Sequence, residues 1–327
     1  MKILLDQTKF GLHIPVMGFD GNELTMKQIL SFAQHAEALG YDSLSVNDHI
    51  VFSTSWLDAI ATLSAVATST TRILIGTSIL NIVVRNPFVS AKALAAIDIL
   101  SSGRLFAGVG PGSHRGDYDA CGIDFSERWP RFSEALQVLV KLLTSDEDNK
   151  NGTLRSDYRS KYYSSPRDII LTPKPIQKPH PPIFVGSWGS DIGLKRLAKY
   201  SNGWMASAYN ITPAKFKEKW NFLLAYRKTL RKEEEEEQPF ENSVMSMFGY
   251  IHEDKAKVRR VVKETLSPAL RRPVEDLEQM LLFGSSDECL LKVRNFIDAG
   301  VKRIHFWPVM DFEDQIHIFK NEISVRL

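Results

Sequence analysis

Cysteine is scarce in this sequence. The 327 residues include two cysteines, Cys121 and Cys289, and neither belongs to a Cys-x-x-Cys pair or another metal-ligand spacing. Two distant cysteines cannot build the disulfide framework of a small secreted domain, and they cannot hold a structural zinc ion. We therefore expect the protein to work in a reducing, cytoplasmic setting.

Long apolar runs and an excess of one charge are missing as well. No uninterrupted stretch of about 18 apolar residues occurs, and the N-terminal Met1–Asp6 lacks the long apolar core of a signal peptide. The 41 basic and 39 acidic residues give a formal net charge of +2. Five consecutive glutamates, Glu233–Glu237, are typical of a solvated loop or helix end. These features argue against a membrane span and against a nucleic-acid partner.

The residues that are present alternate between strand patterns and helix patterns. A composition of 43% hydrophobic and 24% charged residues is ordinary for a globular protein, and the length suits one α/β barrel or two domains. Apolar runs of strand length centre near residues 9, 43, 75, 106, 184, 205, 247 and 304. Eight strands that alternate with helices are typical of a (β/α)8 TIM barrel. We predict this fold, as a single domain over residues 1–327.

Capping patterns mark where several helices begin. Thr25 with Gln28, and Ser285 with Glu288, match the capping box, in which the two side chains bond to each other's backbone N–H groups. Pro87 suits the first position of a helix, because its missing N–H would have no partner there.

The alternation breaks between residues 144 and 181. This polar stretch, rich in Asp, Ser, Lys and Pro, is too long for an ordinary connection from strand to helix. We predict an insertion over 144–181, with a hairpin near Tyr162–Leu171, that lies over one end of the sheet. Further along the chain, helices are expected to fill residues 253–282.

Active sites of TIM barrels lie at the C-terminal ends of the strands, so the residues that follow each strand are the candidates. Asp48 and His49 follow the second strand. Each could equally be structural, Asp48 as a cap of its loop and His49 as a hydrogen-bonded side chain. The strand ends lack the paired carboxylates of a glycosidase and the ligand set of a metal-dependent hydrolase. The strands also lack an internal lysine or glutamate of the kind that a barrel aldolase or isomerase needs.

The segment Pro182–Ser190 is a short apolar strand that runs into a turn and then a helix. Gly186 and Gly189 permit a tight turn, and the first N–H groups of the helix over residues 191–200 have no intrahelical partners. Such a corner suits an anionic group, most often a phosphate, although an ordinary strand-to-helix turn gives the same pattern. Trp188 in this turn is either a packing plug or a stacking surface for a ring.

Several segments, in order along the chain, together resemble the luciferase-like monooxygenase superfamily of barrel proteins, which use FMN or the deazaflavin coenzyme F420. The matching segments are Ala36–Leu44 with Asn47–His49, Thr71–Thr77 with Arg85–Pro87, Asp98–Leu105 with Gly108–Gly112, Arg128–Phe132, Pro173–Pro175, Pro182–Gly189 and Asn202–Trp204. The resemblance implies an oxidoreductase that passes a hydride between the reduced cofactor and a small organic substrate, or activates oxygen to hydroxylate it. It also implies a homodimer.

The resemblance further implies which residues form the site. His49 would donate a proton or contact the substrate, with Asp48 beside it. A bulge with a non-proline cis peptide at Ser78-Ile79 would back the cofactor ring, and glycines after the fourth strand would pass under it. The turn after the fifth strand, with a serine after the sixth, would hold the ribityl phosphate. The residues expected to bind cofactor are Ser78, Ile79, Asn81, Gly110, Gly112, Gly186, Ser187, Trp188, Gly189 and Ser207.

One position departs from part of that superfamily. Some F420-dependent dehydrogenases carry a glutamate after the glycines of the fourth strand, where this chain has Ser113-His114, which argues against a sugar-phosphate dehydrogenase. The Gly-x-x-Gly turn and Asn202-Gly-Trp204 favour F420 over FMN. If His49 were purely structural, the protein would bind a flavin or F420 without turnover, and this alternative stays open.

Overall fold

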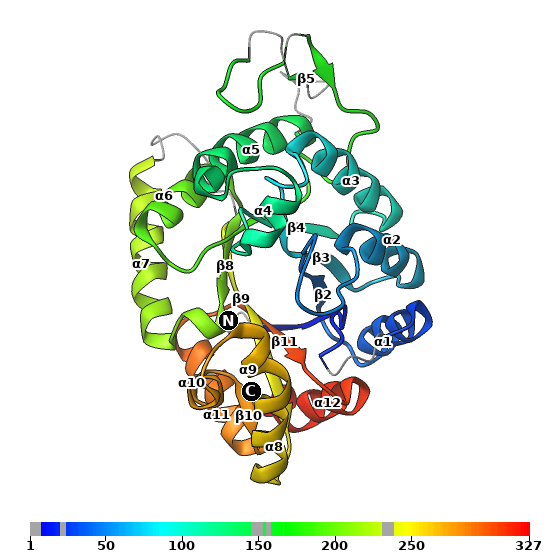
Figure 1. Cartoon of the computed structure of the whole chain (residues 1–327), viewed down its shortest axis with the longest axis vertical. Helices are drawn as coiled ribbons and strands as arrows, with labels where there is room; N and C mark the ends of the chain where they lie inside the picture. The colour runs from blue at the N-terminus through cyan, green and yellow to red at the C-terminus, as the bar shows by residue number, and fades with distance from the viewer. Residues whose placement is uncertain (1–7, 20–23, 145–152, 155–157, 166, 231–238) are drawn as a thin grey trace, which may run out of the picture.

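Eight parallel strands close into a barrel with helices around the outside (Figure 1). The computed structural model describes residues 8–19, 24–144, 153–154, 158–165, 167–230 and 239–327. The barrel strands are β1 (Lys9–His13), β2 (Ser43–Val46), β3 (Leu74–Asn81), β4 (Leu105–Gly110), β7 (Ile183–Gly186), β8 (Gly203–Ser207), β9 (Glu241–Ile251) and β11 (Arg303–Pro308). They pair in this order, and β11 returns to β1. The predicted TIM barrel is confirmed, whereas the glutamate run at 233–237 lies outside the described residues.

The helices follow the strands and begin where the capping patterns predict. Both capping boxes form, Thr25 with Gln28 and Ser285 with Glu288, and Pro87 is the first residue of its helix. No helix among the described residues is long and apolar enough to cross a membrane. The helices are α1 (Met26–Ala38), α2 (Ala59–Ser69), α3 (Pro87–Leu100), α4 (Arg115–Ala120), α5 (Arg128–Leu143), α6 (Asp191–Tyr200), α7 (Pro213–Leu230), α8 (Lys255–Val261), α9 (Ser267–Leu270), α10 (Val274–Met280), α11 (Ser286–Asp298) and α12 (Phe312–Ile318).

The prediction that helices fill residues 253–282 is wrong at its end. A short strand, β10 (Leu282–Gly284), pairs in parallel with the last part of β9. Strand β9 pairs with β11 on one edge and is long enough to pair with both β8 and β10 on the other. Its first half pairs with β8, and a residue with positive φ, Ser246 (φ 55°), follows that half. The apolar run into β10 has no strand periodicity of its own, so a three-residue strand could not be told from a helix end.

The insertion packs against the outer helices, and the prediction that it covers one end of the sheet is wrong. Its two short strands, β5 (Thr153–Leu154) and β6 (Ile169–Ile170), pair with each other beside α5 (Figure 1). The hairpin therefore starts earlier than the predicted Tyr162–Leu171. The backbone N–H of Tyr162 donates to Glu134 of α5 at 2.8 Å, and the Gln177 side chain donates to Asp98 of α3 at 2.7 Å.

A neutral histidine is buried where β1 ends. The His13 ring stacks on Trp307 with centroids 3.3 Å apart, and its Nδ1 donates to the Ile14 carbonyl at 2.7 Å. Its Nε2 accepts the backbone N–H of Asn47 at 3.1 Å, so a proton on both nitrogens would break that bond. Burial lowers the pKa of His13 to about 3, against the weaker opposing effect of its hydrogen bonds. His13 thus fixes the backbone just before Asp48.

This burial makes the fold sensitive to acid. Between pH 6.5 and about 3 the unfolded chain binds a proton at His13 and the folded chain does not, so stability falls as pH falls through that window. We expect His13→Gln to reduce the loss of unfolding free energy between pH 7 and pH 5 by about 2 kcal/mol. Urea denaturation at the two pH values measures this loss. The same substitution at the exposed His35 is the control. An equal loss of unfolding free energy between pH 7 and pH 5 in the wild type and in His13→Gln would contradict the expectation.

Candidate active site

A cavity of about 540 Å³ opens at the C-terminal ends of β2, β3, β4, β7, β8 and β9. Its floor is apolar, because Ile79, Met205 and Met245 line it and pack on the buried Phe106 inside the barrel. The predicted site residues that line the cavity are Asp48, His49, Ser78, Ile79, Gly110, Gly112, Gly186, Ser187, Trp188 and Ser207. Asn81 and Gly189, the other two, do not line it. A second, shallow groove of about 400 Å³ lies near the start of α7, and none of the predicted site residues lines it.

The side chain of Ile79 explains two of the glycines. The peptide bond Ser78-Ile79 is cis, as the resemblance predicts. A Cβ added at Gly186 would lie 2.7 Å from Ile79, and one added at Gly110 would lie 3.0 Å from it. Both strand ends must therefore lack a side chain for Ile79 to form the cavity floor.

Asn81 and Gly112 meet just behind this floor. Gly112 has φ +70°, and a Cβ there would lie 2.5 Å from the Asn81 amide nitrogen. The Asn81 Oδ1 atom accepts the N–H of Val83 at 3.2 Å, and the side chain is buried. Asn81 therefore shapes the wall from behind.

The turn before α6 has the form of an anion-binding corner. The Ser187 hydroxyl accepts the N–H of Gly189 at 3.2 Å, and Ser190 caps the helix by accepting the N–H of Gly193 at 3.3 Å. A Cβ at Gly193 would lie 2.8 Å from the Ser187 hydroxyl, so the turn and helix are in close contact. The first turn of α6 offers N–H groups without intrahelical partners, which favour an anion.

Trp188 and Ser207 both line the cavity, and they offer a ligand different kinds of contact. Trp188 lines the cavity and is 58% exposed, so it is not a packing plug. An exposed indole on a cavity wall is suited to stacking on a ring. The Ser207 hydroxyl accepts a hydrogen bond from Asn210 at 3.0 Å, which leaves its own O–H available as a donor.

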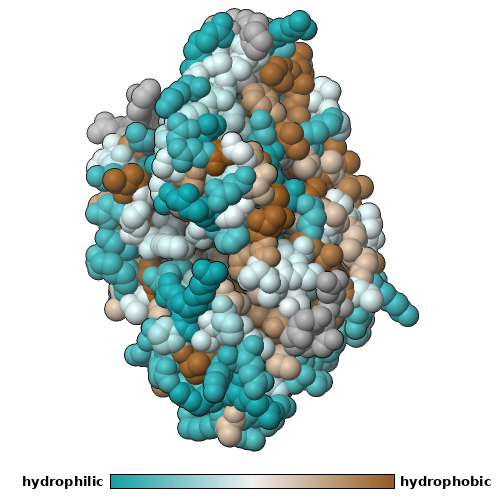
Figure 2. All heavy atoms as spheres, in the orientation of Figure 1, coloured by the Kyte–Doolittle hydropathy of each residue, from teal (hydrophilic) through white to brown (hydrophobic). Residues whose placement is uncertain are grey.

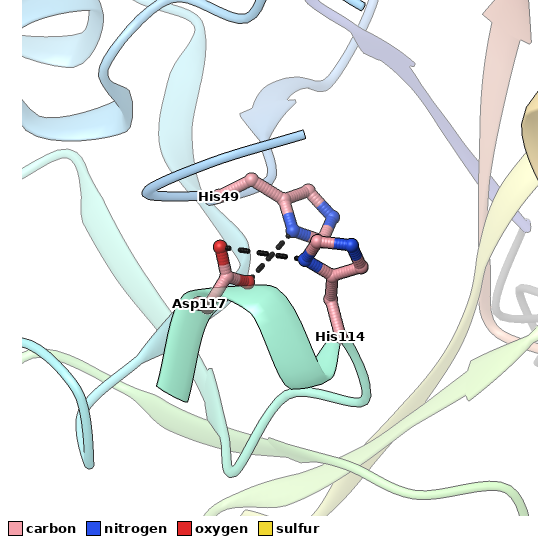
Figure 3. Close-up of side chains that lie close together, drawn as sticks. All are labelled: His49, His114 and Asp117. Carbon is pink, nitrogen blue, oxygen red and sulfur yellow. Dashed lines mark hydrogen bonds and ion pairs between the residues drawn. The ribbon is translucent and has the colours of Figure 1, made fainter. Parts of the chain in front are cut away.

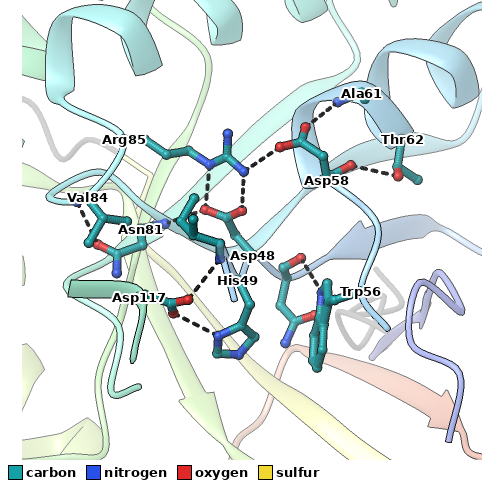
Figure 4. Close-up of polar contacts among 12 residues, drawn as sticks. Asp48, His49, Trp56, Asp58, Ala61, Thr62, Asn81, Val84, Arg85 and Asp117 are labelled. Carbon is teal, nitrogen blue, oxygen red and sulfur yellow. Dashed lines mark hydrogen bonds and ion pairs between the residues drawn. The ribbon is translucent and has the colours of Figure 1, made fainter. Parts of the chain in front are cut away.

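The carboxylate of Asp48 forms an ion pair with Arg85. Its carboxylate accepts Nε of Arg85 at 2.7 Å and Nη2 at 2.6 Å, and the backbone N–H of Asn81 at 3.2 Å (Figure 4). Arg85 also bonds to Asp58 at 2.6 Å. Burial by itself would lower the pKa of Arg85, but its bonds to Asp48 and Asp58 raise it above its usual value. The pair ties the end of β2 to the loop after β3.

His49 is oriented by a carboxylate on the unpredicted helix α4. Its Nδ1 lies 2.9 Å from Oδ2 of Asp117 (Figure 3). The Oδ1 atom of Asp117 accepts the N–H groups of Ile50 at 2.9 Å and Val51 at 3.0 Å. Burial would raise the pKa of Asp117, but these hydrogen bonds and the nearby imidazole lower it. An ionised carboxylate only accepts, so Nδ1 carries the proton and Nε2 is free to act as a base.

Aromatic rings surround His49. Phe52 and Trp56 each lie 4.6 Å from its ring, and His114 lies 5.5 Å away at right angles (distances between centroids). These contacts hold the imidazole at the edge of the cavity and reduce its access to water.

The sequence did not single out several residues of this site. Asp117 is not among the predicted site residues, because the six-residue α4 on which it lies is too short to show helical periodicity. Arg128 also lines the cavity; it stacks on Phe125 at 4.0 Å and donates to the Phe125 carbonyl at 3.0 Å. Its segment, Arg128–Phe132, matched the family pattern, and that was the available signal.

The fold and site define a TIM-barrel protein with a large cavity at its strand ends, a helix N-terminus beside that cavity and a histidine oriented by a carboxylate. Residues 8–303 match the family model described as luciferase-like monooxygenase, and the chain belongs to this family. The F420-dependent glucose-6-phosphate dehydrogenase of Amycolatopsis mediterranei is 25% identical, over 92% of this chain and 94% of the relative.

Two solved structures show the same fold. An F420-dependent secondary alcohol dehydrogenase, solved with an F420-acetone adduct, superposes with a TM-score of 0.80 at 19% identity, over 98% of this chain and 100% of that one. The oxygenating constituent of 3,6-diketocamphane monooxygenase from Pseudomonas putida, solved with FMN, gives 0.70 at 15% identity, over 98% and 99%.

The Asp48–Arg85 pair yields a stability prediction. Arg85→Met leaves a buried carboxylate without its partner, so we expect the free energy of unfolding to fall by about 3 kcal/mol. Arg259 is a matched control, because it also bridges two carboxylates, Glu275 and Glu278, but is half exposed. Arg259→Met should change stability by less than about 1 kcal/mol. Urea denaturation at pH 7 compares the two, and equal effects would contradict this account of Asp48.

Proposed function

We propose that this protein is an oxidoreductase that uses F420 or FMN to transfer a hydride to or from a small organic substrate, or to activate oxygen for its hydroxylation. The observation that carries the proposal is the cavity itself. Its lining brings together the floor at Ile79, the turn before α6 and His49, which Asp117 orients. The family membership and the F420-dependent relative support it. The chain would act as one domain over residues 1–327.

The residues present fit such a cofactor. We assign its phosphate to the turn of Ser187 and Ser190 with Ser207, and its ring to the floor at Ile79, with Trp188 as a wall. The cofactor supplies hydride transfer at its ring when bound, whereas the protein supplies position, a dry pocket and a proton site. F420 is proposed ahead of FMN, in line with the relative of Amycolatopsis mediterranei.

His49 is the proposed proton site. Its Nε2 would accept a proton from a substrate hydroxyl as hydride leaves, or return one to a carbonyl oxygen in the reverse direction. Asp117 would keep Nδ1 protonated and stabilise the imidazolium that forms, as a carboxylate does for a catalytic histidine elsewhere. Asp48 would act as a positioning residue, because Arg85 occupies its carboxylate.

The cavity argues for an uncharged or singly charged substrate. Arg128 and the paired Asp48 are the fully ionised side chains among the described residues that line it. Since the corner before α6 is assigned to the cofactor, little cationic surface is left for a sugar phosphate. The Ser113-His114 pair after the glycines of the fourth strand, where some F420-dependent dehydrogenases carry a glutamate, points the same way.

The homodimer and the cytoplasmic location are also part of the proposal. Helix α3 exposes the apolar residues Val89, Ala96, Ile99 and Leu100 with one charged residue, Lys92, among them, and the adjacent α2 has no charged residue. Figure 2 shows apolar surface along the edge where these helices lie. A contiguous exposed apolar patch is normally covered, and a second copy of the chain is our proposed cover.

Cofactor binding is the first test. We expect F420 to bind below millimolar concentration, and Trp188→Ala to weaken binding about tenfold because it removes a stacking surface. Tyr200→Ala, at the other end of α6, is the control and should bind as the wild type does. Titration by fluorescence with F420, and separately with FMN, measures both. Binding of neither cofactor would overturn the proposal, and light scattering on the same sample checks for a dimer.

Turnover separates an enzyme from a non-catalytic binding protein. We expect His49→Ala and Asp117→Asn to lower turnover by on the order of 10²-fold, because the proton site is lost or wrongly oriented. The dissociation constant of F420 should stay unchanged in both, and Asp117→Glu should recover part of the turnover. Oxidation or reduction of F420 with a panel of secondary alcohols and ketones provides the measurement. Full turnover in His49→Ala would favour the purely structural role of this histidine.

A further inference from the structure

Two histidines and one carboxylate converge beside the cavity (Figure 3). The ligand atoms of His49, His114 and Asp117 all lie within 4.8 Å of one another. Nδ1 of His49 lies 2.9 Å from one oxygen of Asp117, and Nδ1 of His114 lies 3.7 Å from the other. In a tetrahedral zinc site with bonds of about 2.0 to 2.1 Å, neighbouring ligand atoms are about 3.3 Å apart. The cluster therefore needs shifts of under about 1 Å to surround an ion.

The electrostatics of the cluster favour a cation. The Asp117 side chain is 2% exposed, and its recorded ion-pair partners are these two imidazoles. Hydrogen bonds from His49, Ile50 and Val51 stabilise the ionised Asp117, but none of these partners carries a permanent counter-charge. A divalent ion would supply it.

His114 adds a second, independent observation. Its Nδ1 is buried and has no hydrogen-bond partner among the described residues, although the rest of the ring is 36% exposed. Buried polar atoms are nearly always satisfied, so an orphan nitrogen near a carboxylate marks a missing partner. The exposed part of the ring also leaves a path for an ion to enter.

We propose that His49, His114 and Asp117 form a binding site for a divalent transition-metal ion of the zinc class. Two imidazole nitrogens and one carboxylate oxygen are ligands that Zn²⁺ and Co²⁺ accept, and the three leave further coordination positions open. The ion would bind Nδ1 of His49 in place of its proton, the proton would move through solvent to Nε2, and the hydrogen bond from Nδ1 to Asp117 would be lost. Metal binding would thus compete with the orientation of His49, and micromolar Zn²⁺ would inhibit turnover.

Titration of the full-length, cofactor-free protein with Co²⁺ tests the site. We expect one ion to bind per chain with micromolar affinity, with the visible absorption of low-coordinate Co²⁺, and Zn²⁺ to displace it. His114→Ala and Asp117→Asn should each weaken binding at least tenfold. The control is His35→Ala, because His35 forms an exposed pair with Glu313 at 2.8 Å, and this pair belongs to no three-ligand cluster among the described residues. This variant should bind as the wild type does.

The outcomes separate this site from the cofactor site. Thermal unfolding of each variant shows that it is folded, and His114→Gln replaces His114→Ala if the latter does not fold. No Co²⁺ uptake below millimolar concentration, or uptake that survives loss of His114, would overturn the metal site and leave two histidines that share one carboxylate. Because no cofactor is present, either result leaves F420 binding untouched.

Discussion

The cavity depends on two buried carboxylates that tie together loops from three neighbouring strands. Asp48, after β2, binds the backbone of Asn81 at the end of β3 and the side chain of Arg85 beyond β3. Asp117, beyond β4, holds the backbone of Ile50 and Val51 beyond β2. Loops usually vary in position because few contacts fix them. Here each carboxylate accepts several hydrogen bonds from another loop, so the three loops form one rigid rim.

Adjacent residues in this rim have opposite tasks. The carboxylate of Asp48 is satisfied by a bidentate guanidinium and has little capacity left for a substrate. His49, the next residue, uses Nδ1 for its hydrogen bond to Asp117, and its Nε2 remains available. A site that needs a movable proton must leave one group partly unsatisfied, and the surrounding ion pairs make this possible without loss of order.

The sequence predicted the architecture well because strand and helix periodicities are local. All eight barrel strands, both capping boxes and the helix start at Pro87 follow from patterns within a few residues. The short α4 and β10 were missed, since neither is long enough to show a period. The candidate site followed from strand ends and family resemblance, but its pairings did not. Asp117 lies 68 residues from His49 along the chain, and no local pattern connects them.

The glycines show how a motif and its physical cause can differ. In the sequence, Gly186 reads as part of a turn that approaches a phosphate. In the structure, its first constraint is packing, because a Cβ there would lie 2.7 Å from Ile79. The same side chain constrains Gly110 at 3.0 Å, so one isoleucine requires glycine on two strands. A larger residue at either position would displace Ile79 and change the cavity floor before it could obstruct any anion. The glycines therefore define the shape of the cavity floor at least as much as they define the turn before α6.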